Sequence, residues 1–251
     1  MPAPLLSLKD LDKVYNNGTV ALKDVNFTVH PGEFISFVGP SGCGKSTILR
    51  LIAGLGAPTQ GAITWNGTQR NLAFVFQDAA LMPWANLVDN IYLPLKLKGQ
   101  RLRTVRGDIQ DAINTVDLNG FEHSYPRQLS GGMKMRVSIA RALVTKPDVL
   151  LMDEPFGALD EMTRSRLNSD LLTLWETKQW TVLFVTHNIY EAVYLSTHVV
   201  VMAAHPGRVV TKIPIEAPYP RTSSFRTSSQ FNHYCREIMT ALSAVEDVGV
   251  V

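Results

Sequence analysis

The sequence predicts an α/β fold with a parallel-sheet core, an antiparallel β layer at the N-terminus and an inserted helical subdomain. The core is predicted by short apolar runs, which are typical of parallel strands buried on both faces. These runs span residues 34–38, 72–76, 149–153 and 181–185. The first 38 residues instead combine alternating hydrophobicity with turn signals, and residues from about 86 to 145 carry apolar side chains at helical spacing.

The N-terminal layer is expected to start with strands at 5–14 and 21–29. Asn16-Asn17-Gly18 between them is a hairpin turn signal, and His30-Pro31-Gly32 marks a second turn before the first core strand. A later turn at 58–61 leads into a strand at 62–65. Residues 1–38 therefore predict a small antiparallel layer that leads into the parallel core.

Helices are predicted where apolar residues recur every three or four positions. In the insertion, Val105, Ile109, Ile113 and Val116 share one face of a helix over 101–117, which Gly120 ends. The other predicted helices span 48–53, 133–144, 163–175, 188–195 and 229–242, and a last strand spans 199–202. We therefore expect a domain over 1–215 with its helical insertion at about 86–145, followed by a C-terminal tail over 216–251 that contains a helix.

A glycine-rich loop lies between the first core strand and the first helix. It matches the pattern G-x-x-x-x-G-K-[ST], and its strand–loop–helix context indicates a phosphate-binding loop and hence a P-loop NTPase core. The loop consists of Gly39, Pro40, Ser41, Gly42, Cys43, Gly44, Lys45, Ser46 and Thr47. Backbone N–H groups and the helix N-terminus would bind phosphate, Lys45 would reach the β- and γ-phosphates, and Ser46 would ligate Mg²⁺. A plain glycine-rich turn is the weaker alternative with these flanks.

Two carboxylates, Asp153 and Glu154, end the core strand at 149–153. In nucleotidases with a phosphate loop, such an aspartate holds Mg²⁺ directly or through water, and the neighbouring glutamate polarises the attacking water. A solvated acidic turn is the alternative. Four apolar residues that run into Asp-Glu downstream of a phosphate loop favour the metal and base roles.

Three further residues have two interpretations each. Gln77 and His187 follow core strands, where α/β proteins place groups that contact ligands. A solvated amide and a structural histidine are nevertheless the commoner cases for such residues. Tyr15 is either a sheet residue, which its position favours, or an aromatic plate on which an adenine ring stacks. The residues alone leave these alternatives open.

Composition argues against several classes of protein. The 251 residues include 24 basic and 22 acidic side chains with a formal net charge of +2, and no basic stripe for nucleic acid is visible. Cys43 and Cys235 make neither a disulfide framework nor a metal cluster, which favours a reducing, cytoplasmic compartment. The N-terminus does not resemble a signal peptide, and no apolar run approaches the ~20 residues that span a bilayer. We expect that the chain does not cross a membrane by itself.

The segment Leu129-Ser130-Gly131-Gly132-Met133, upstream of Asp153, makes residues 5–215 resemble the ATP-binding subunits of ABC transporters. The resemblance implies ATP and Mg²⁺ as cofactors, with residues 39–47 as the Walker A loop. It implies that Asp153 and Glu154 are the Walker B pair and that residues 158–160 are the D-loop. The implied catalytic residues are Lys45, Gln77, Glu154 and His187, and the implied metal ligands are Ser46, Gln77 and Asp153.

The same resemblance resolves the open alternatives. Tyr15 would stack on the adenine, Gln77 would be the Q-loop glutamine that contacts Mg²⁺ and senses the transmembrane partner, and His187 would contact the γ-phosphate. Leu129–Met133 resembles the signature motif, although Met133 stands where glutamine is commonest. Its ATP-binding residues would be Ser130, Gly131 and Gly132.

The signature motif also has a physical interpretation as a second anion site, because a serine and two glycine N–H groups start a helix. One chain would therefore carry two phosphate-binding helix starts for one nucleotide. In the family a head-to-tail homodimer resolves this, since Ser130 of one copy covers the ATP held by Lys45 of the other. The implied partners are a second copy, transmembrane permease subunits and, indirectly, an extracytoplasmic solute-binding protein, with no nucleic acid.

Finer resemblance points to the importers of nitrate, sulfonates and taurine. It rests on the stretches 76–84 and 202–209 and on the tail helix. The chain departs from the family in having Asn188 where aspartate usually follows the switch histidine, and in a short segment between Gly67 and Leu72. The implied function is ATP hydrolysis that powers import at the cytoplasmic face of the inner membrane, as a peripheral subunit, with the identity of the solute left open.

Two other classes compete with an importer ATPase. A soluble ABC ATPase that acts on nucleic acid or ribosomes usually has two fused cassettes, long coiled-coil insertions or zinc motifs, which this sequence lacks. A GTPase would need the guanine-specifying Asn-Lys-x-Asp, and residues 145–148 lack the asparagine. A small-molecule kinase leaves the signature motif unexplained.

Overall fold

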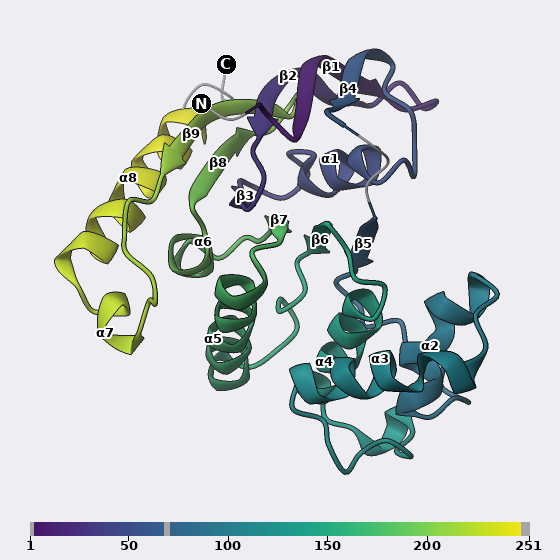
Figure 1. Cartoon of the computed structure of the whole chain (residues 1–251). Helices are drawn as coiled ribbons and strands as arrows, with labels where there is room; N and C mark the ends of the chain where they lie inside the picture. Colours follow the sequence, from purple (N-terminus) through teal and green to yellow (C-terminus); the bar gives the residue numbers. More distant parts are fainter. Residues whose placement is uncertain (1–2, 68–70, 247–251) are drawn as a thin grey trace. The chain divides into compact units, whose positions relative to one another are not determined.

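The computed structural model describes residues 3–67 and 71–246, which form two compact units. The first unit combines the N-terminal part of the chain with residues from Gln179 onward, and the second spans Arg70–Lys178. Figure 1 labels the helices and strands of both. The shortened segment noted between Gly67 and Leu72 falls largely on residues 68–70, which lie outside the described part.

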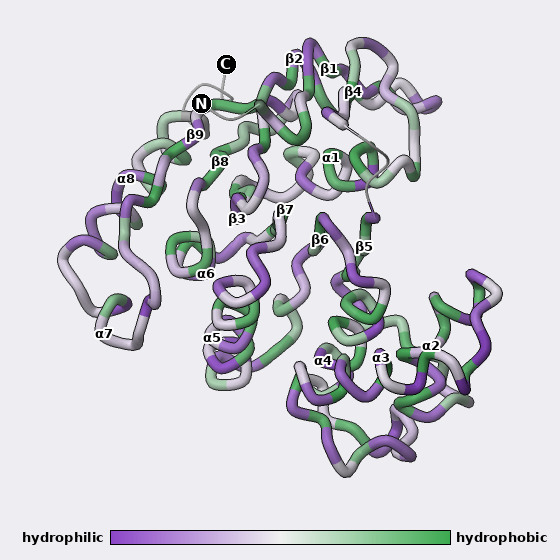
Figure 2. Tube along the Cα trace, in the orientation of Figure 1, coloured by the Kyte–Doolittle hydropathy of each residue, from purple (hydrophilic) through white to green (hydrophobic). Residues whose placement is uncertain are grey.

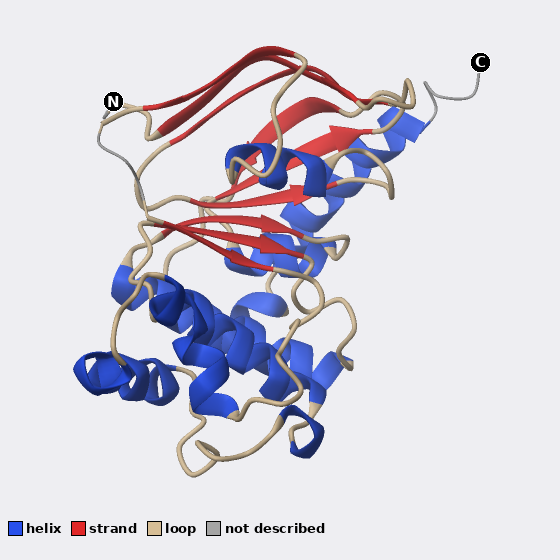
Figure 3. Ribbon diagram, turned by 90° about the vertical axis from the view of Figure 1, so that its right-hand side faces the viewer, coloured by secondary structure: helices blue, strands red, loops and turns tan. Residues whose placement is uncertain are grey.

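An antiparallel sheet forms the N-terminal layer of the first unit. β1 (Leu6–Val14) pairs with β2 (Val20–Val29) on one side and with β4 (Gln60–Trp65) on the other. The hairpin turn has Gly18 at φ 82°, and the Tyr15 N–H donates to Thr19 O at 2.9 Å. Figure 3 shows these three strands as a separate layer, so the predicted antiparallel layer is confirmed.

A mostly parallel sheet forms the core of the same unit. β3 (Phe34–Val38) lies between β7 (Thr181–Val185) and β8 (His198–Ala203), parallel to both. All residues of β3 and β7 are buried, and Figure 2 shows the hydrophobic colour of these strands. β9 (Arg208–Pro214), which was not predicted, pairs antiparallel with β8.

In its described residues, the first unit has four helices beside its sheets. α1 (Lys45–Ile52) follows β3, and α6 (Ile189–Leu195) follows β7. α7 (Ser223–Arg226) and α8 (Ser229–Glu246) belong to the tail, and α8 packs against α6, β8 and β9. In Figure 1 the yellow α8 runs beside the green β9. The helix predicted in the tail is therefore confirmed.

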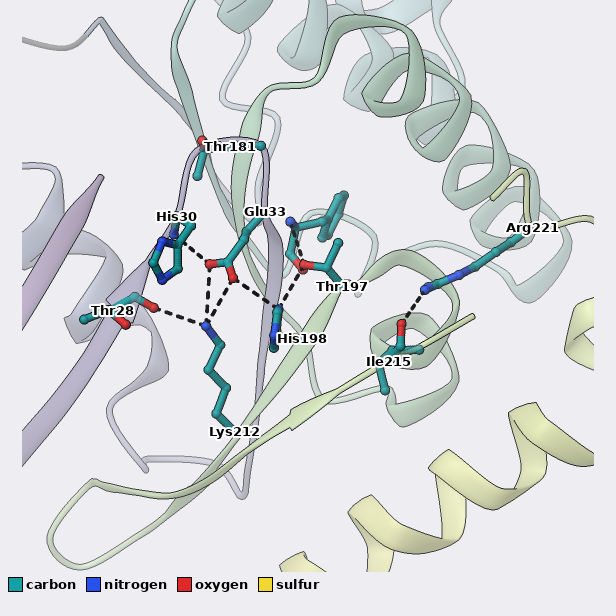
Figure 4. Close-up of polar contacts among 11 residues, drawn as sticks. Thr28, His30, Glu33, Thr181, Thr197, His198, Lys212, Ile215 and Arg221 are labelled. Carbon is teal, nitrogen blue, oxygen red and sulfur yellow. Dashed lines mark hydrogen bonds and ion pairs between the residues drawn. The ribbon is translucent and has the colours of Figure 1, made fainter. Parts of the chain in front are cut away.

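The ends of four strands in the first unit meet at the carboxylate of Glu33. Glu33 accepts hydrogen bonds from the His30 N–H at 2.8 Å and from Lys212 Nζ at 3.4 Å, and His198 Nδ1 lies at 3.3 Å. Lys212 also donates to Thr28 O at 3.2 Å. Figure 4 shows Glu33 at the centre of this group. The contacts fasten β2, β3, β8 and β9 together at one end.

The second unit contains two parallel strands, β5 (Leu72–Val75) and β6 (Val149–Asp153). β6 is buried at every residue, but the prediction that a strand over 72–76 is buried on both faces is wrong. Phe76 lies beyond β5 with 40% of its surface exposed, and Phe74 is only half-buried. β5 is the last strand in the order of its sheet, and a hollow of about 230 Å³ borders Leu72 and Phe74. One face of the strand is therefore incompletely covered.

The helices of the second unit follow the predicted pattern with one addition. α3 (Leu102–Thr115), α4 (Gly131–Leu143) and α5 (Glu161–Lys178) match predicted helices, with α4 starting two residues earlier. α2 (Leu87–Leu97) was not predicted as a separate helix, and its Pro94 explains why the pattern was weak there. A short 3₁₀ turn, η1 (Pro126–Gln128), precedes α4. The predicted fold class is confirmed.

None of the helices in the described part is both long and apolar enough to span a lipid bilayer.

Candidate functional site

The phosphate loop spans the interval between the end of β3 and the start of α1. Gly44 is the N-cap of α1 with φ 87°, and its carbonyl accepts from the Ile48 N–H at 2.9 Å. Within the loop the Cys43 N–H donates to Pro40 O at 3.3 Å. Because the N-cap is a glycine, no side-chain oxygen caps the first N–H groups of α1. The helix start is thus suited to an external anion.

Two loop glycines are required for steric reasons that the sequence pattern does not show. A Cβ on Gly44 would lie 2.5 Å from Leu22 Cδ2 and 2.9 Å from Ala21 O, in addition to its left-handed backbone. A Cβ on Gly39 would lie 2.6 Å from Met202 O. β2 and β8 therefore pack directly on the loop backbone and hold its shape.

Lys45 is 6% exposed and folds back on the loop. Its ammonium donates to Gly39 O at 2.8 Å and Pro40 O at 3.0 Å, and Cys43 Sγ lies at 3.7 Å. Burial raises the pKa of the Cys43 thiol, although the nearby Lys45 opposes this. The thiol is therefore a neutral, packed group, and the lysine is the positive charge of the loop.

Tyr15 lies one residue beyond β1 and is 41% exposed. Its hydroxyl is 3.3 Å from Thr47 Oγ1, and the Lys13 ammonium lies 5.4 Å from its ring centroid. The interpretation as a sheet residue is thus wrong, because the strand ends at Val14. An exposed ring beside the phosphate loop can stack on a planar base.

His187 follows β7 at the same end of the sheet as the phosphate loop. Val185 of β7 is in register with Phe37 of β3, and the Thr186 N–H donates to Phe37 O at 3.2 Å. His187 is exposed, and α6 begins two residues later, at Ile189. Asn188, the departure from the family pattern, caps α6, since its side chain accepts from the Glu191 N–H at 3.2 Å. Asparagine thus keeps the capping function of aspartate.

In the second unit, Asp153 ends the buried β6 and Glu154 follows it, and the two residues lie in different environments. Asp153 is 7% exposed, whereas Glu154 is half-buried. Glu154 adopts φ 45°, a left-handed conformation that is unfavourable for glutamate, and its carbonyl accepts from the Gly157 N–H at 3.1 Å. Strained backbone conformations of this kind are found at functional sites, and the carboxylate of Glu154 can act as a base.

The signature segment starts α4. Ser130 is the N-cap, and its hydroxyl accepts from the Met133 N–H at 3.2 Å. A Cβ on Gly132 would lie 2.7 Å from Thr163 Cγ2 of α5. Asp160 caps the start of α5 by accepting from the Thr163 N–H at 3.0 Å, and this hydrogen bond lowers the pKa of the Asp160 carboxyl. Signature and D-loop segments are therefore packed side by side.

Gln77 is exposed at the start of a loop that leads to α2. Two residues that sequence reasoning missed hold this loop. The fully buried Asn90 bonds the backbone of Met82 in both directions, accepting from its N–H at 2.7 Å and donating to its O at 3.2 Å. Arg141 donates to the carbonyls of Ala79 and Ala80 at 2.7 and 2.9 Å. The sequence signal that could have revealed Asn90 is the presence of an asparagine among the apolar residues of α2.

The predicted site residues thus fall into two groups. The first unit brings together Tyr15, residues 39–47 and the strand end that carries His187. The second unit carries Gln77, the segment 130–132 and the pair Asp153–Glu154. A serine hydroxyl, a glutamine amide and a carboxylate, at Ser46, Gln77 and Asp153, are all oxygen donors of the kind that Mg²⁺ prefers.

Comparisons with known proteins agree on one family. Residues 22–157 match the family described as ABC transporter. The chain is 42% identical over 249 residues to the aliphatic sulfonates import ATP-binding protein SsuB of Bacillus licheniformis, covering 96% of this chain and 95% of that protein.

Two solved structures are similar in fold. The CbiO1 protein of Clostridium perfringens, part of an ABC transporter complex, has a TM-score of 0.78 at 26% identity, covering 86% of this chain and 90% of that one. The dimeric cassette MJ0796 bound to ADP and phosphate after hydrolysis has a TM-score of 0.74 at 32% identity, covering 85% of this chain and all of that one. The chain therefore belongs to the ABC transporter family, as an ATP-binding and ATP-hydrolysing subunit.

Proposed function

We propose that this ATPase powers the import of a small sulfonate-type anion from the cytoplasmic face of the membrane. The observation that carries the proposal is the 42% identity over nearly the whole chain to a protein named for aliphatic sulfonate import. Nitrate, taurine and pyrimidine-type precursors are the other solutes that the sequence resemblance leaves open. The cassette contacts only ATP and its protein partners, so the solute is selected elsewhere in the transporter.

ABC cassettes dimerise and work with membrane permease subunits, as the dimeric MJ0796 and the CbiO1 complex illustrate. We infer that two copies of this chain pair head-to-tail on ATP, each Ser130 segment covering the ATP held by the other copy's phosphate loop. The glycine N-cap of α1 and the serine N-cap of α4 both suit phosphate oxygens. A solute-binding protein outside the membrane would deliver the anion to the permease.

Within one copy, we assign ATP binding to the phosphate loop and Tyr15. Lys45 would exchange its bonds to the carbonyls of Gly39 and Pro40 for phosphate oxygens, and the Tyr15 ring would stack on adenine. Ser46, Gln77 and Asp153 would hold Mg²⁺, which neutralises charge on the phosphates when bound.

We assign proton transfer to Glu154, whose carboxylate would orient and polarise the attacking water. Its left-handed backbone directly after β6 supports this role, because strained conformations of this kind are found at functional sites. His187 would donate a hydrogen bond to the γ-phosphate. The loop over residues 77–84, in which Trp84 is 76% exposed, would contact the permease.

The test is the variant Glu154→Gln, which preserves shape and removes the base. We expect kcat to fall by about 100-fold or more, with ATP binding retained and an ATP-dependent dimer visible by size-exclusion chromatography. Lys45→Ala is the matched comparison, since it should lose ATP binding itself and form no dimer. Turnover at the wild-type rate in the Glu154→Gln variant would refute the assigned role.

The substrate class needs a separate experiment in cells. Deletion of the gene should prevent growth on an aliphatic sulfonate as the sole sulfur source but not on sulfate. Unchanged growth on sulfonates, together with a defect on nitrate or taurine, would leave the ATPase assignment intact and correct only the solute.

A further inference from the structure

The tail, residues 216–246, supplies a buried arginine to the helix that follows His187. Arg221 is only 4% exposed. Its guanidinium donates to three carbonyls at the end of α6, those of Val193 at 2.9 Å, Tyr194 at 3.0 Å and Ser196 at 2.9 Å. It also donates to Ile215 O at 3.2 Å and Ala217 O at 3.4 Å, and Figure 4 shows it directed at the Ile215 carbonyl.

These contacts make Arg221 the C-terminal cap of α6. The last carbonyls of a helix have no partner within the helix, and a cation there also interacts favourably with the helix dipole. α6 has only seven residues. So short a helix is not stable by itself and depends on tertiary contacts for its position.

Aromatic contacts reinforce the same junction. The Arg221 guanidinium lies 4.2 Å from the Tyr219 ring centroid, and the Arg226 guanidinium lies 3.8 Å from that of Tyr194. The Tyr194 hydroxyl donates to Arg221 O at 2.8 Å, and the Tyr219 hydroxyl donates to Leu195 O at 3.3 Å. Hydrogen bonds therefore run in both directions between α6 and the tail.

The opposite end of α6 is bonded to the residues that flank His187. The Thr186 hydroxyl donates to Glu191 Oε2 at 2.6 Å, and the Asn188 N–H donates to Thr186 Oγ1 at 3.0 Å. The Glu191 N–H in turn donates to Asn188 Oδ1 at 3.2 Å. The backbone of His187 is thus fixed from both sides by the first turn of α6.

We propose that Arg221 is a positioning residue for ATP hydrolysis, through which the tail holds α6 and thereby places His187. The proposal rests on the function assigned to His187 above. The tail would thus act on the reaction by restraining one end of a seven-residue helix whose other end is bonded to the residues that flank the histidine.

The first test compares Arg221→Met and Arg221→Lys with the control Arg236→Met in the full-length chain. Arg236 is an exposed arginine of α8. We expect Arg221→Met to lower kcat by about ten- to a hundred-fold, because small displacements of a catalytic group have effects of that size. The KM for ATP should change less than about two-fold, since the phosphate loop is not altered. The kcat of Arg221→Lys should lie between those of Arg221→Met and wild type, and the kcat of Arg236→Met should match wild type.

The second test asks whether Arg221 acts through His187. In a double-mutant cycle, Arg221→Met should cost little further activity once His187→Ala is present. Hydrogen exchange of the amides in residues 187–196 should be faster in Arg221→Met, while exchange in β3 and β7 stays as in wild type.

Three results would overturn the proposal. These are an unchanged kcat per folded molecule in Arg221→Met, additive effects in the cycle, or a uniform rise in exchange that reflects global destabilisation alone. Wild-type activity in His187→Ala would instead remove the assigned role of His187 itself. If His187→Ala lowers kcat and Arg221→Met does not, only the positioning of His187 by the tail is rejected.

Discussion

The phosphate loop and the signature segment are both helix starts to which we assign phosphate binding, but they are built differently. The start of α1 has a glycine N-cap at φ 87° that is packed under Leu22 and Ala21. The start of α4 has an ordinary serine cap with φ −66°, and Ser130 and Gly131 are exposed. Strands of its own unit pack on the backbone of the first at Gly39 and Gly44, whereas the second lies open at the surface. The difference is what one expects if the second is completed by another copy of the chain.

The largest effect should come from placing a side chain on the enclosed loop. Gly44→Ala combines a left-handed backbone with a Cβ at 2.5 Å from Leu22 Cδ2, so we expect a loss of about 2–4 kcal/mol of unfolding free energy and of ATP binding. Urea denaturation and nucleotide titration measure both.

Gly42→Ala is the matched control for the loop, because Gly42 has φ 80° but a Cβ added there would meet no atom within 4 Å. We expect a cost of only about 1–2 kcal/mol from the backbone alone. Equal effects of the two substitutions would show that packing under β2 does not matter.

A smaller effect is expected at the open helix start. Ser130→Ala removes the acceptor of the Met133 N–H and should cost about 1 kcal/mol, whereas Ser130→Gly should cost a few tenths. Thermal unfolding compares the two variants. If alanine were no worse than glycine, the serine would not act as a cap, and the contrast with α1 would lose its basis.

The smallest effect concerns chemical reactivity rather than stability. Burial raises the pKa of the Cys43 thiol, so less thiolate is present near neutral pH and alkylation should be slow. In the double variant Ser130→Cys/Cys235→Ser, the introduced thiol should react at least about ten-fold faster than the Cys43 thiol. The reason is that position 130 is exposed at a helix N-terminus. The alkylation rates of the two thiols test this prediction. Comparable rates would mean that the Cys43 thiol is not buried in the loop.

Much of the fold was predictable because its signals are local. The buried strands β3, β6 and β7 appear as short apolar runs in the sequence, and α3 appears as a periodic pattern. Phe76 could not be placed correctly, since exposure of an apolar residue next to a strand depends on what covers that face. β9 was missed because its alternation is weak and its pairing with β8 is antiparallel within a parallel sheet.

The site divides in the same way. The types and spacing of the residues in the phosphate loop, the carboxylate pair and the signature segment predicted which groups would bind ATP, because each motif is a short stretch with its own chemistry. The supports of those motifs come from distant segments. Asn90 and Arg141 hold the loop after Gln77, and nothing in their immediate sequence announces that they bond backbone rather than ligand.

The phosphate loop, the carboxylates at the end of β6 and the glycine-rich start of α4 were thus determined by the sequence alone, since backbone conformation and phosphate chemistry act over a few residues. Only the tertiary structure decided that Gly44 is sealed by β2, that β5 leaves one face half covered, and that Arg221 of the tail caps the helix behind His187. Those contacts join residues far apart in the chain, and their energies exist only once the chain is folded.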